Sequence, residues 1–214
     1  MKGGAAVSIL YYLLSALAGY LLGCSNMALY LSKLMKTDLR KGGSGNLGAS
    51  NAMIVLGWRA GIVVGVHDIG KAVLAVVLAR YFFPELPLIG AVAGVFCVLG
   101  HMFPVFLRFR GGKGFASYLG MTLALNWRFA LLVLAAVTLV TLITDYIVAG
   151  TMTTIFCVPI YLGIAEHSWL LAAILCAASA VIMCKHRENF VRIWNGTEMG
   201  LRRANRGEGR AVRT

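Results

Sequence analysis

Charged residues are scarce in this sequence, and acidic ones are the scarcest. Only 13% of the 214 residues are Asp, Glu, Lys or Arg, whereas 59% are apolar and the mean hydropathy is +0.80. A soluble domain of this size could not carry that balance on its surface, so most of the chain must face lipid. The composition therefore excludes an ordinary soluble enzyme and predicts an integral membrane protein.

The chain also lacks the cysteine patterns of metal or disulfide proteins. Its five cysteines lie in or beside apolar runs, and none has the CxxC spacing. This arrangement argues against a bound metal and an extracellular disulfide framework, and it favours core packing. Because no soluble basic segment with interleaved aromatic residues is present, nucleic acid is not expected as a partner.

Several apolar runs approach the 20 or so residues needed to cross a bilayer. The first is too long for the core of a signal peptide and lacks a convincing cleavage site, so we expect a span rather than a leader. We predict an all-α integral membrane protein with about seven transmembrane helices, or about five if the short run 115–125 and its partner do not cross. The predicted spans are residues 5–31, 59–83, 88–107, 115–125, 129–144, 147–165 and 168–184.

The net charge of +12 is concentrated in three segments, around residues 33–41, 108–113 and from 185 onward. The positive-inside rule places all three in the cytoplasm, with the N-terminus outside and the C-terminus inside. Attraction to anionic lipid alone is the simpler explanation of this charge. We expect residues 1–199 to form one transmembrane domain and residues 200–214 to be a basic, mobile cytoplasmic tail.

The first polar segment, residues 38–51, contains closely spaced glycines around a serine and an asparagine. Such glycines let consecutive N–H groups converge as an anion nest, and the residues after them can open a helix whose N-terminus favours phosphate. A flexible linker with an N-cap is the alternative. The candidate phosphate-binding residues here are Arg40, Lys41, Gly43, Ser44, Gly45 and Asn46.

The second segment is Gly111, Gly112, Lys113 and Gly114. A lysine among glycines can act as a point-charge clamp for phosphate. The segment is not a Walker A loop, because Leu107 and Phe115 occupy positions that require glycine and Ser or Thr. Phosphate binding without nucleotide hydrolysis is therefore predicted.

The third segment begins at Lys185. In a helix, His186, Asn189 and Arg192 would share one face, and Glu198 follows shortly after. A charged helix end that anchors to headgroups is the alternative.

Inside the predicted second span, Asp68 and Lys71 are three residues apart. Buried charges within a membrane are expensive and tend to pair, so we predict a structural ion pair.

Taken together, GSGNLGASN, GHMFPVFLRFRGGKG and KHRENFVRIWNGTE, in this order and spacing, resemble the acyl-phosphate-dependent glycerol-3-phosphate acyltransferases of bacteria. The resemblance runs from the first span to Glu198. It implies an enzyme of the cell inner membrane, with a cytoplasmic active site, that transfers a fatty acyl group from acyl phosphate to the 1-hydroxyl of glycerol-3-phosphate, giving lysophosphatidic acid. It implies no metal, nucleotide cofactor or acyl-CoA, and no partner beyond the two substrates and membrane lipid.

The resemblance also implies individual roles. Ser44, His186 and Asn189 match the catalytic residues of the family, Lys113 matches the lysine of its glycine loop, and Glu198 matches a structural glutamate. Ile54 departs from the pattern, because the family usually has arginine there. We expect Arg40 or Lys41 to supply the missing charge. A paralogue with lost or altered activity and a small anion transporter are the alternative functions.

Overall fold

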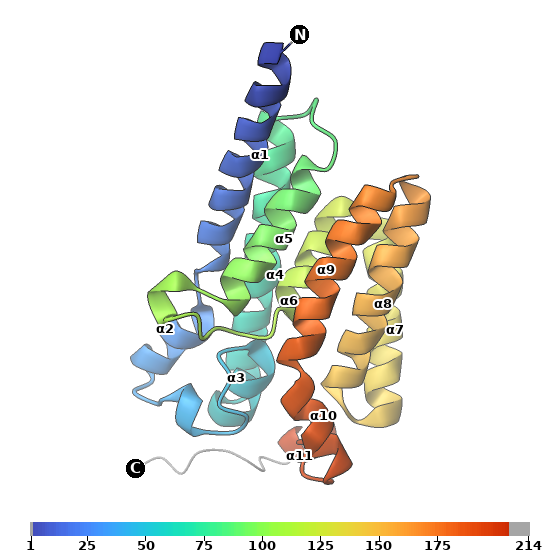
Figure 1. The fold of residues 1–214 in the computed structure, drawn as a ribbon. Helices are drawn as coiled ribbons and strands as arrows, with labels where there is room; N and C mark the ends of the chain where they lie inside the picture. The colour runs from blue at the N-terminus through green and yellow to red at the C-terminus, as the bar shows by residue number, and fades with distance from the viewer. Residues whose placement is uncertain (1, 206–214) are drawn as a thin grey trace.

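The structure is a computed structural model, and it describes residues 2–205. Over this range the chain forms helices and loops without a strand, which confirms the predicted all-α architecture. Long helices run side by side, and the short helices α2, α3, α10 and α11 gather at one end (Figure 1). The elements are α1 Lys2–Gly23, α2 Met27–Leu34, η1 Leu39–Lys41, α3 Ala49–Leu56, α4 Trp58–Phe82, α5 Ile89–Met102, η2 Val105–Leu107, α6 Phe115–Leu125, α7 Trp127–Thr144, α8 Ile147–Ala165, α9 Trp169–Lys185, α10 Arg187–Trp194 and α11 Leu201–Asn205.

Within residues 2–205, five helical stretches are long and apolar enough to cross a membrane, and α9 with α10, bent by 46°, adds a sixth if the pair crosses as one. The bounds of α6 and α8 agree with the predicted runs 115–125 and 147–165. With 11 residues, α6 is about 16 Å long, roughly half the thickness of the hydrocarbon core.

The first predicted span differs from the structure, because residues 24–26 separate α1 from α2. The Asn26 side chain accepts a hydrogen bond from the N–H of Leu29 at 2.8 Å and so caps α2. The carbonyl of Ser25 accepts from Lys71 Nζ, also at 2.8 Å. The break is therefore stabilised by a local cap and by a cation from another helix.

Small residues let α1 and α5 approach closely. A Cβ atom added to Gly19 would lie 2.2 Å from the Ala93 carbonyl oxygen, and one added to Gly100 would lie 2.1 Å from the carbonyl oxygen of Tyr20. Such contacts are typical of membrane helices that pack backbone to backbone.

Two apolar clusters place the polar segments. The larger joins α4 to α9, including Val98, Tyr118 and Leu175. The smaller packs α2, η1 and α3 against α4 around Leu39 and Leu47, and so holds the first polar segment at the end of the bundle.

Candidate active site

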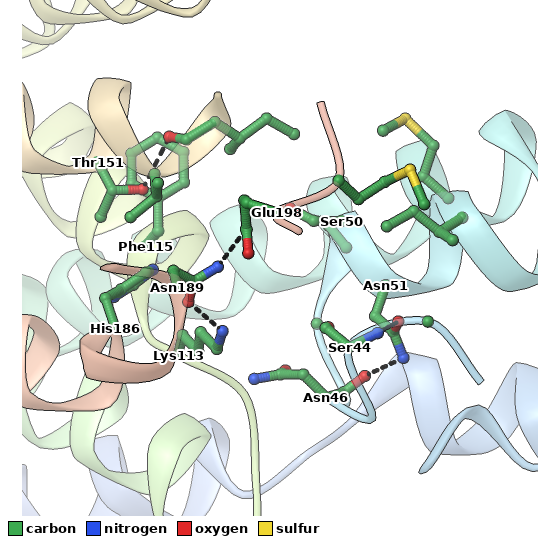
Figure 2. Close-up of a pocket in the computed structure, with 18 of the residues that line it drawn as sticks. Ser44, Asn46, Ser50, Asn51, Lys113, Phe115, Thr151, His186, Asn189 and Glu198 are labelled. Carbon is green, nitrogen blue, oxygen red and sulfur yellow. Dashed lines mark hydrogen bonds between the residues drawn. The ribbon is translucent and has the colours of Figure 1, made fainter. Parts of the chain in front are cut away.

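A pocket of about 380 Å³ lies among α3, the glycine loop before α6, the start of α8 and the segment around α10. Its volume falls within the range of about 300–1,000 Å³ that is usual for small-molecule sites. Ser44, Asn46 and Asn51 lie on one side, Lys113 and His186 lie on the other, and Glu198 is between them (Figure 2).

All three predicted segments contribute to this one pocket. The predicted residues that line it are Gly43, Ser44, Asn46, Asp68, Lys113, Gly114, His186, Asn189, Arg192 and Glu198. The predicted residues outside its lining are Arg40, Lys41, Gly45, Lys71, Gly111 and Gly112.

The loop of the first segment is held by Asn51. Its Oδ1 accepts from the N–H of Ser44 and its Nδ2 donates to the carbonyl of Asn46, both at 2.8 Å. The N–H of Gly45 donates to the Gly42 carbonyl at 3.0 Å. The N–H groups of Ser44 and Gly45, which were predicted to form an anion nest, therefore already have partners within the segment. The Ser44 hydroxyl has no hydrogen-bond partner among the described residues and lines the pocket.

The glycine loop packs against the end of α5. Gly111 donates its N–H to the Met102 carbonyl at 3.2 Å, and Gly112 donates to the His101 carbonyl at 3.1 Å. In this structure these two N–H groups, which were predicted to bind phosphate, are already bonded within the protein. A Cβ atom at Gly112 would lie 2.0 Å from His101 Nε2, so glycine is needed here for close packing. Lys113 follows directly and lines the pocket.

A hydrogen-bonded chain connects Lys113 with the third segment (Figure 2). Lys113 Nζ donates to Asn189 Oδ1, and Asn189 Nδ2 donates to Glu198 Oε1 at 2.5 Å. Arg192 Nε donates to Glu198 Oε2 at 2.6 Å. Arg192 Nη2 is buried and has no hydrogen-bond partner within residues 2–205. Burial, followed by the charge of Arg192, lowers the pKa of Lys113.

His186 is buried at the bend between α9 and α10. Its Nδ1 lies 2.8 Å from the carbonyl oxygen of Ile182 and must donate to it, since a carbonyl only accepts. In the neutral ring, Nε2 then has a lone pair. His186 can therefore accept a hydrogen bond from a hydroxyl in the pocket.

Two helix N-termini face the pocket from opposite sides. α3 begins after Gly48 and α6 after Gly114, and neither N-cap residue makes a side-chain cap. The first N–H groups of both helices lack intrahelical partners, and the helix dipoles favour anions there. The helix predicted after the first segment is present as α3.

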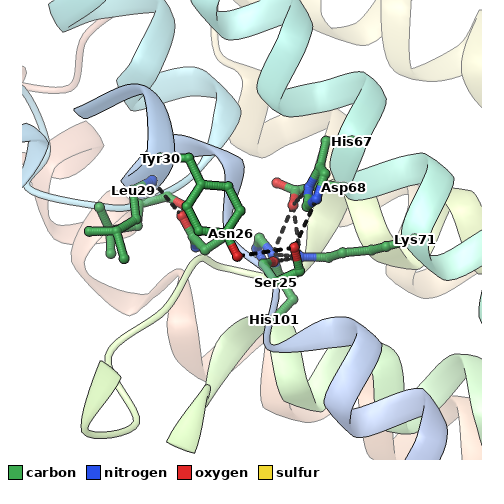
Figure 3. Close-up of polar contacts among 9 residues, drawn as sticks. Ser25, Asn26, Leu29, Tyr30, His67, Asp68, Lys71 and His101 are labelled. Atoms are coloured by element: carbon green, nitrogen blue, oxygen red, sulfur yellow. Dashed lines mark hydrogen bonds and ion pairs between the residues drawn. The ribbon is translucent and has the colours of Figure 1, made fainter. Parts of the chain in front are cut away.

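A polar network joins α4 and α5 with the break between α1 and α2 (Figure 3). Lys71 Nζ lies 2.8 Å from Asp68 Oδ1, which is the predicted pair, and 2.9 Å from His101 Nδ1. His67 Nε2 lies 3.0 Å from the hydroxyl of Ser25. Asp68 and His101 also line the pocket. Because the His101 ring contacts Gly112, this network supports the loop that carries Lys113.

Sequence reasoning missed part of the lining. Thr151 in α8 lies within an apolar run that gives no functional signal. Met199, Gly200 and Leu201 also line the pocket, and Gly200 is buried. Of the predicted tail 200–214, residues 201–205 form α11, and residues 206–214 lie outside the described range.

Neither Arg40 nor Lys41, the residues expected to compensate for Ile54, lies in the lining of the pocket. Ile54 is 8% exposed and lines the pocket. The Arg40 guanidinium points away to Asp38, with Nε 3.1 Å from Oδ1, and neither Arg40 nor Lys41 lines the pocket. The reason is local, because Asp38 also caps the short helix η1 and so holds Arg40 beside it.

The fold and the pocket together define a helical membrane protein whose three polar segments meet in one pocket. The family pattern described as Glycerol-3-phosphate acyltransferase matches residues 13–196, and the chain belongs to this family. The predicted class, an acyltransferase of phospholipid synthesis, is therefore confirmed.

Individual relatives agree over most of their length. The chain is 39% identical to the glycerol-3-phosphate acyltransferase of Coxiella burnetii over 191 residues, which cover 87% of this chain and 96% of the relative. It is 37% identical to that of Clostridioides difficile over 198 residues, which cover 90% and 96%. The crystal structure of PlsY (YgiH), an integral membrane glycerol 3-phosphate acyltransferase, in its glycerol 3-phosphate form superposes with a TM-score of 0.83 at 31% identity, covering 89% of this chain and 95% of that one.

Proposed function

We propose that this protein transfers a fatty acyl group from acyl phosphate to the 1-hydroxyl of glycerol-3-phosphate and releases lysophosphatidic acid. One observation supports this most directly. Two uncapped helix N-termini, Lys113 and the unpartnered Nη2 of Arg192 belong to one pocket. The reaction brings two phosphate groups together, and the pocket offers a separate anion-binding helix end for each.

The chemistry needs no covalent intermediate, because acyl phosphate is an activated mixed anhydride. The bond between the acyl carbon and the phosphate oxygen breaks, and the glycerol oxygen forms the new ester. The proton of the hydroxyl goes to the departing phosphate, which leaves as HPO₄²⁻. The protein's task is to position both substrates and stabilise developing charge.

Different residues of the pocket bind the phosphates and orient the glycerol hydroxyl. Lys113, Arg192 and the first N–H groups of α3 and α6 bind phosphate oxygens. Asn189 is held between Lys113 and Glu198 and keeps the lysine in place. The lone pair on His186 Nε2 and the hydroxyl of Ser44 orient the glycerol hydroxyl.

The basic segments that carry the pocket residues support a cytoplasmic site in an inner-membrane protein. The start of α6 and the start of α8 both line the pocket, and α7 runs between them. The chain must therefore travel away along α6 and return along α7. We propose α6 as a short seventh span, with the N-terminus outside, the C-terminus in the cytoplasm and residues 1–199 as one acyltransferase domain.

Labelling tests this sidedness. In a cysteine-free background, single cysteines at Arg110 and Asn195, both exposed, should resist an impermeant thiol reagent in intact cells and react after lysis. Labelling of either from outside would contradict the proposed orientation.

Purified protein tests the activity. Palmitoyl phosphate with glycerol-3-phosphate should give lysophosphatidic acid and one phosphate per ester, whereas palmitoyl-CoA should give none. If folded protein forms no product from palmitoyl phosphate, the alternative of a paralogue with altered activity is favoured. That alternative is based on the apolar Ile54 in the pocket, where the family usually has arginine. An anion transporter is disfavoured, since it would place polar motifs near the midplane of both halves of the protein.

A further inference from the structure

One wall of the pocket lies beyond the part of the chain that matches the family. The match ends at residue 196, whereas Met199, Gly200 and Leu201 line the cavity. We use the name C-terminal strap for residues 199–202. Its last two residues begin α11, which lies at the same end of the bundle as α3 and α10 (Figure 1).

The strap is attached at one side to Asp145, the turn residue between α7 and α8. The N–H of Leu201 donates to the Asp145 carbonyl at 2.8 Å, and the N–H of Arg202 donates to Asp145 Oδ1 at 2.9 Å. Arg202 Nη2 also donates to the Leu142 carbonyl at 3.2 Å. The aspartate thus receives two backbone N–H groups at the start of α11.

Gly200 makes this attachment sterically possible. A Cβ atom there would lie 1.9 Å from Asp145 Oδ2 and 2.7 Å from its Cγ. The backbone of Gly200 has no positive φ angle, so alanine would be accommodated by the backbone and would clash only with its surroundings. A single methyl group should therefore push the Asp145 carboxylate and the strap apart and weaken the bond between Asp145 Oδ1 and the N–H of Arg202.

At its other side the strap reaches the α3 half of the molecule. Met199 packs against the apolar cluster that contains Leu39, Ile54 and Val55. The strap thus runs from the α7–α8 turn to α3 and presents apolar side chains to the cavity. The Arg202 side chain is 71% exposed, which marks the outer side of the strap as facing water or headgroups.

We propose that the C-terminal strap closes the water-facing side of the pocket and so directs the acyl group to glycerol-3-phosphate instead of water. This inference rests on the proposed function. In the competing reaction, water attacks the acyl carbon, the bond from that carbon to the phosphate oxygen breaks, and a fatty acid and inorganic phosphate leave. Exclusion of water from a closed site is a recognised way to suppress such hydrolysis.

The ratio of hydrolysis to transfer tests the strap. Gly200→Ala and Asp145→Ala would be compared with wild type by measuring free fatty acid and lysophosphatidic acid from palmitoyl phosphate in the same reaction. Loss of a hydrogen bond to a charged acceptor should shift the strap toward its open form, and raise the ratio, by about tenfold. The ratio is independent of how much protein is folded.

Two further variants serve as controls. Asp145→Asn keeps an oxygen that can accept from Arg202 but loses the charge, so its ratio should lie between those of wild type and Asp145→Ala. Glu166→Ala removes an exposed acidic residue at the α8–α9 turn and should not change it.

The outcomes separate the two proposals. If wild-type protein makes no lysophosphatidic acid, the proposed function fails. If it does, and transfer and hydrolysis fall together or stay unchanged in both Gly200→Ala and Asp145→Ala, the inference about the strap is overturned.

Discussion

The contribution of Lys113 can be tested by replacing it with methionine, which keeps much of the length and removes the charge. In the structure the ammonium group donates one hydrogen bond, to Asn189. An ammonium has three donors, so two remain for a phosphate. The lysine is partly buried beside the uncapped start of α6, where a charge-assisted bond is screened less than at an open surface.

The expected magnitude follows from these contacts. A hydrogen bond between charged groups contributes about 1.5–3 kcal/mol, which corresponds to a roughly ten- to hundredfold change in affinity. Lys113→Met should therefore raise KM for at least one of the two phosphate substrates by that factor. Initial rates with each substrate varied in turn, with lysophosphatidic acid as the measured product, would give both constants.

Lys185→Met is the matched control. Lys185 also lies in a basic segment, but its Nζ is 4.2 Å from the centre of the Phe103 ring, and the residue does not line the pocket. Its replacement should change KM less than threefold, as a surface cation–π contact would. If both substitutions change KM by the same small factor, the glycine loop does not take part in the active site.

The lowered pKa of Lys113 adds a pH dependence to the same prediction. The ammonium binds phosphate only while protonated, and burial moves its loss of charge to lower pH than for an ordinary lysine. Phosphate affinity should therefore fall on the alkaline side in wild type. In Lys113→Arg, the guanidinium stays charged, so any remaining affinity should not fall there.

Three further substitutions probe the surroundings of the site. Gly112→Ala places a methyl group against the His101 ring and should lower the free energy of unfolding by about 1–3 kcal/mol. The loss would be measured as a lower melting temperature. An unchanged melting temperature with full activity would contradict that packing. Glu198→Gln weakens the charged acceptor that holds Asn189 and should lower kcat/KM about tenfold, and a neutral result would exclude a positioning role. Ile54→Arg should lower KM for glycerol-3-phosphate about tenfold if the pocket needs a third cation beside Lys113 and Arg192. No gain would show that the charge missing at position 54 is immaterial.

The helices were largely predictable, since long apolar runs end where Pro, Asp or Asn residues appear. The run that ends before Asp145 and the one that begins after it correspond to α7 and α8. The break between α1 and α2 was missed, because Ser25 and Asn26 lie inside an otherwise apolar run. Besides the Asn26 cap, the break is stabilised by Lys71, which is 46 residues beyond Ser25, and no local pattern reports such a contact.

The site was predictable in its residue types and less so in their bonding. Lysine among glycines drew attention to Lys113, which lines the pocket, but whether a loop N–H group is free depends on its tertiary partners. Gly112 donates to His101 in α5, and Ser44 donates to Asn51 on α3. The strap could not be found from sequence, because an Arg- and Gly-rich segment is typical of a mobile tail and its anchor, Asp145, lies far away in the chain.

The charge balance of the pocket gives the helix ends a larger role than the side chains alone would suggest. Two side-chain cations, Lys113 and Arg192, line the cavity within the described residues, and Arg192 is already paired with Glu198. Two substrate phosphates bring more negative charge than these groups can neutralise, and Ile54 adds none. If the proposed function holds, we expect most of the remaining stabilisation to come from backbone N–H groups at the starts of α3 and α6. Because those donors are fixed by the fold, they are present before substrate binds and need no reorganisation as charge develops on the departing phosphate.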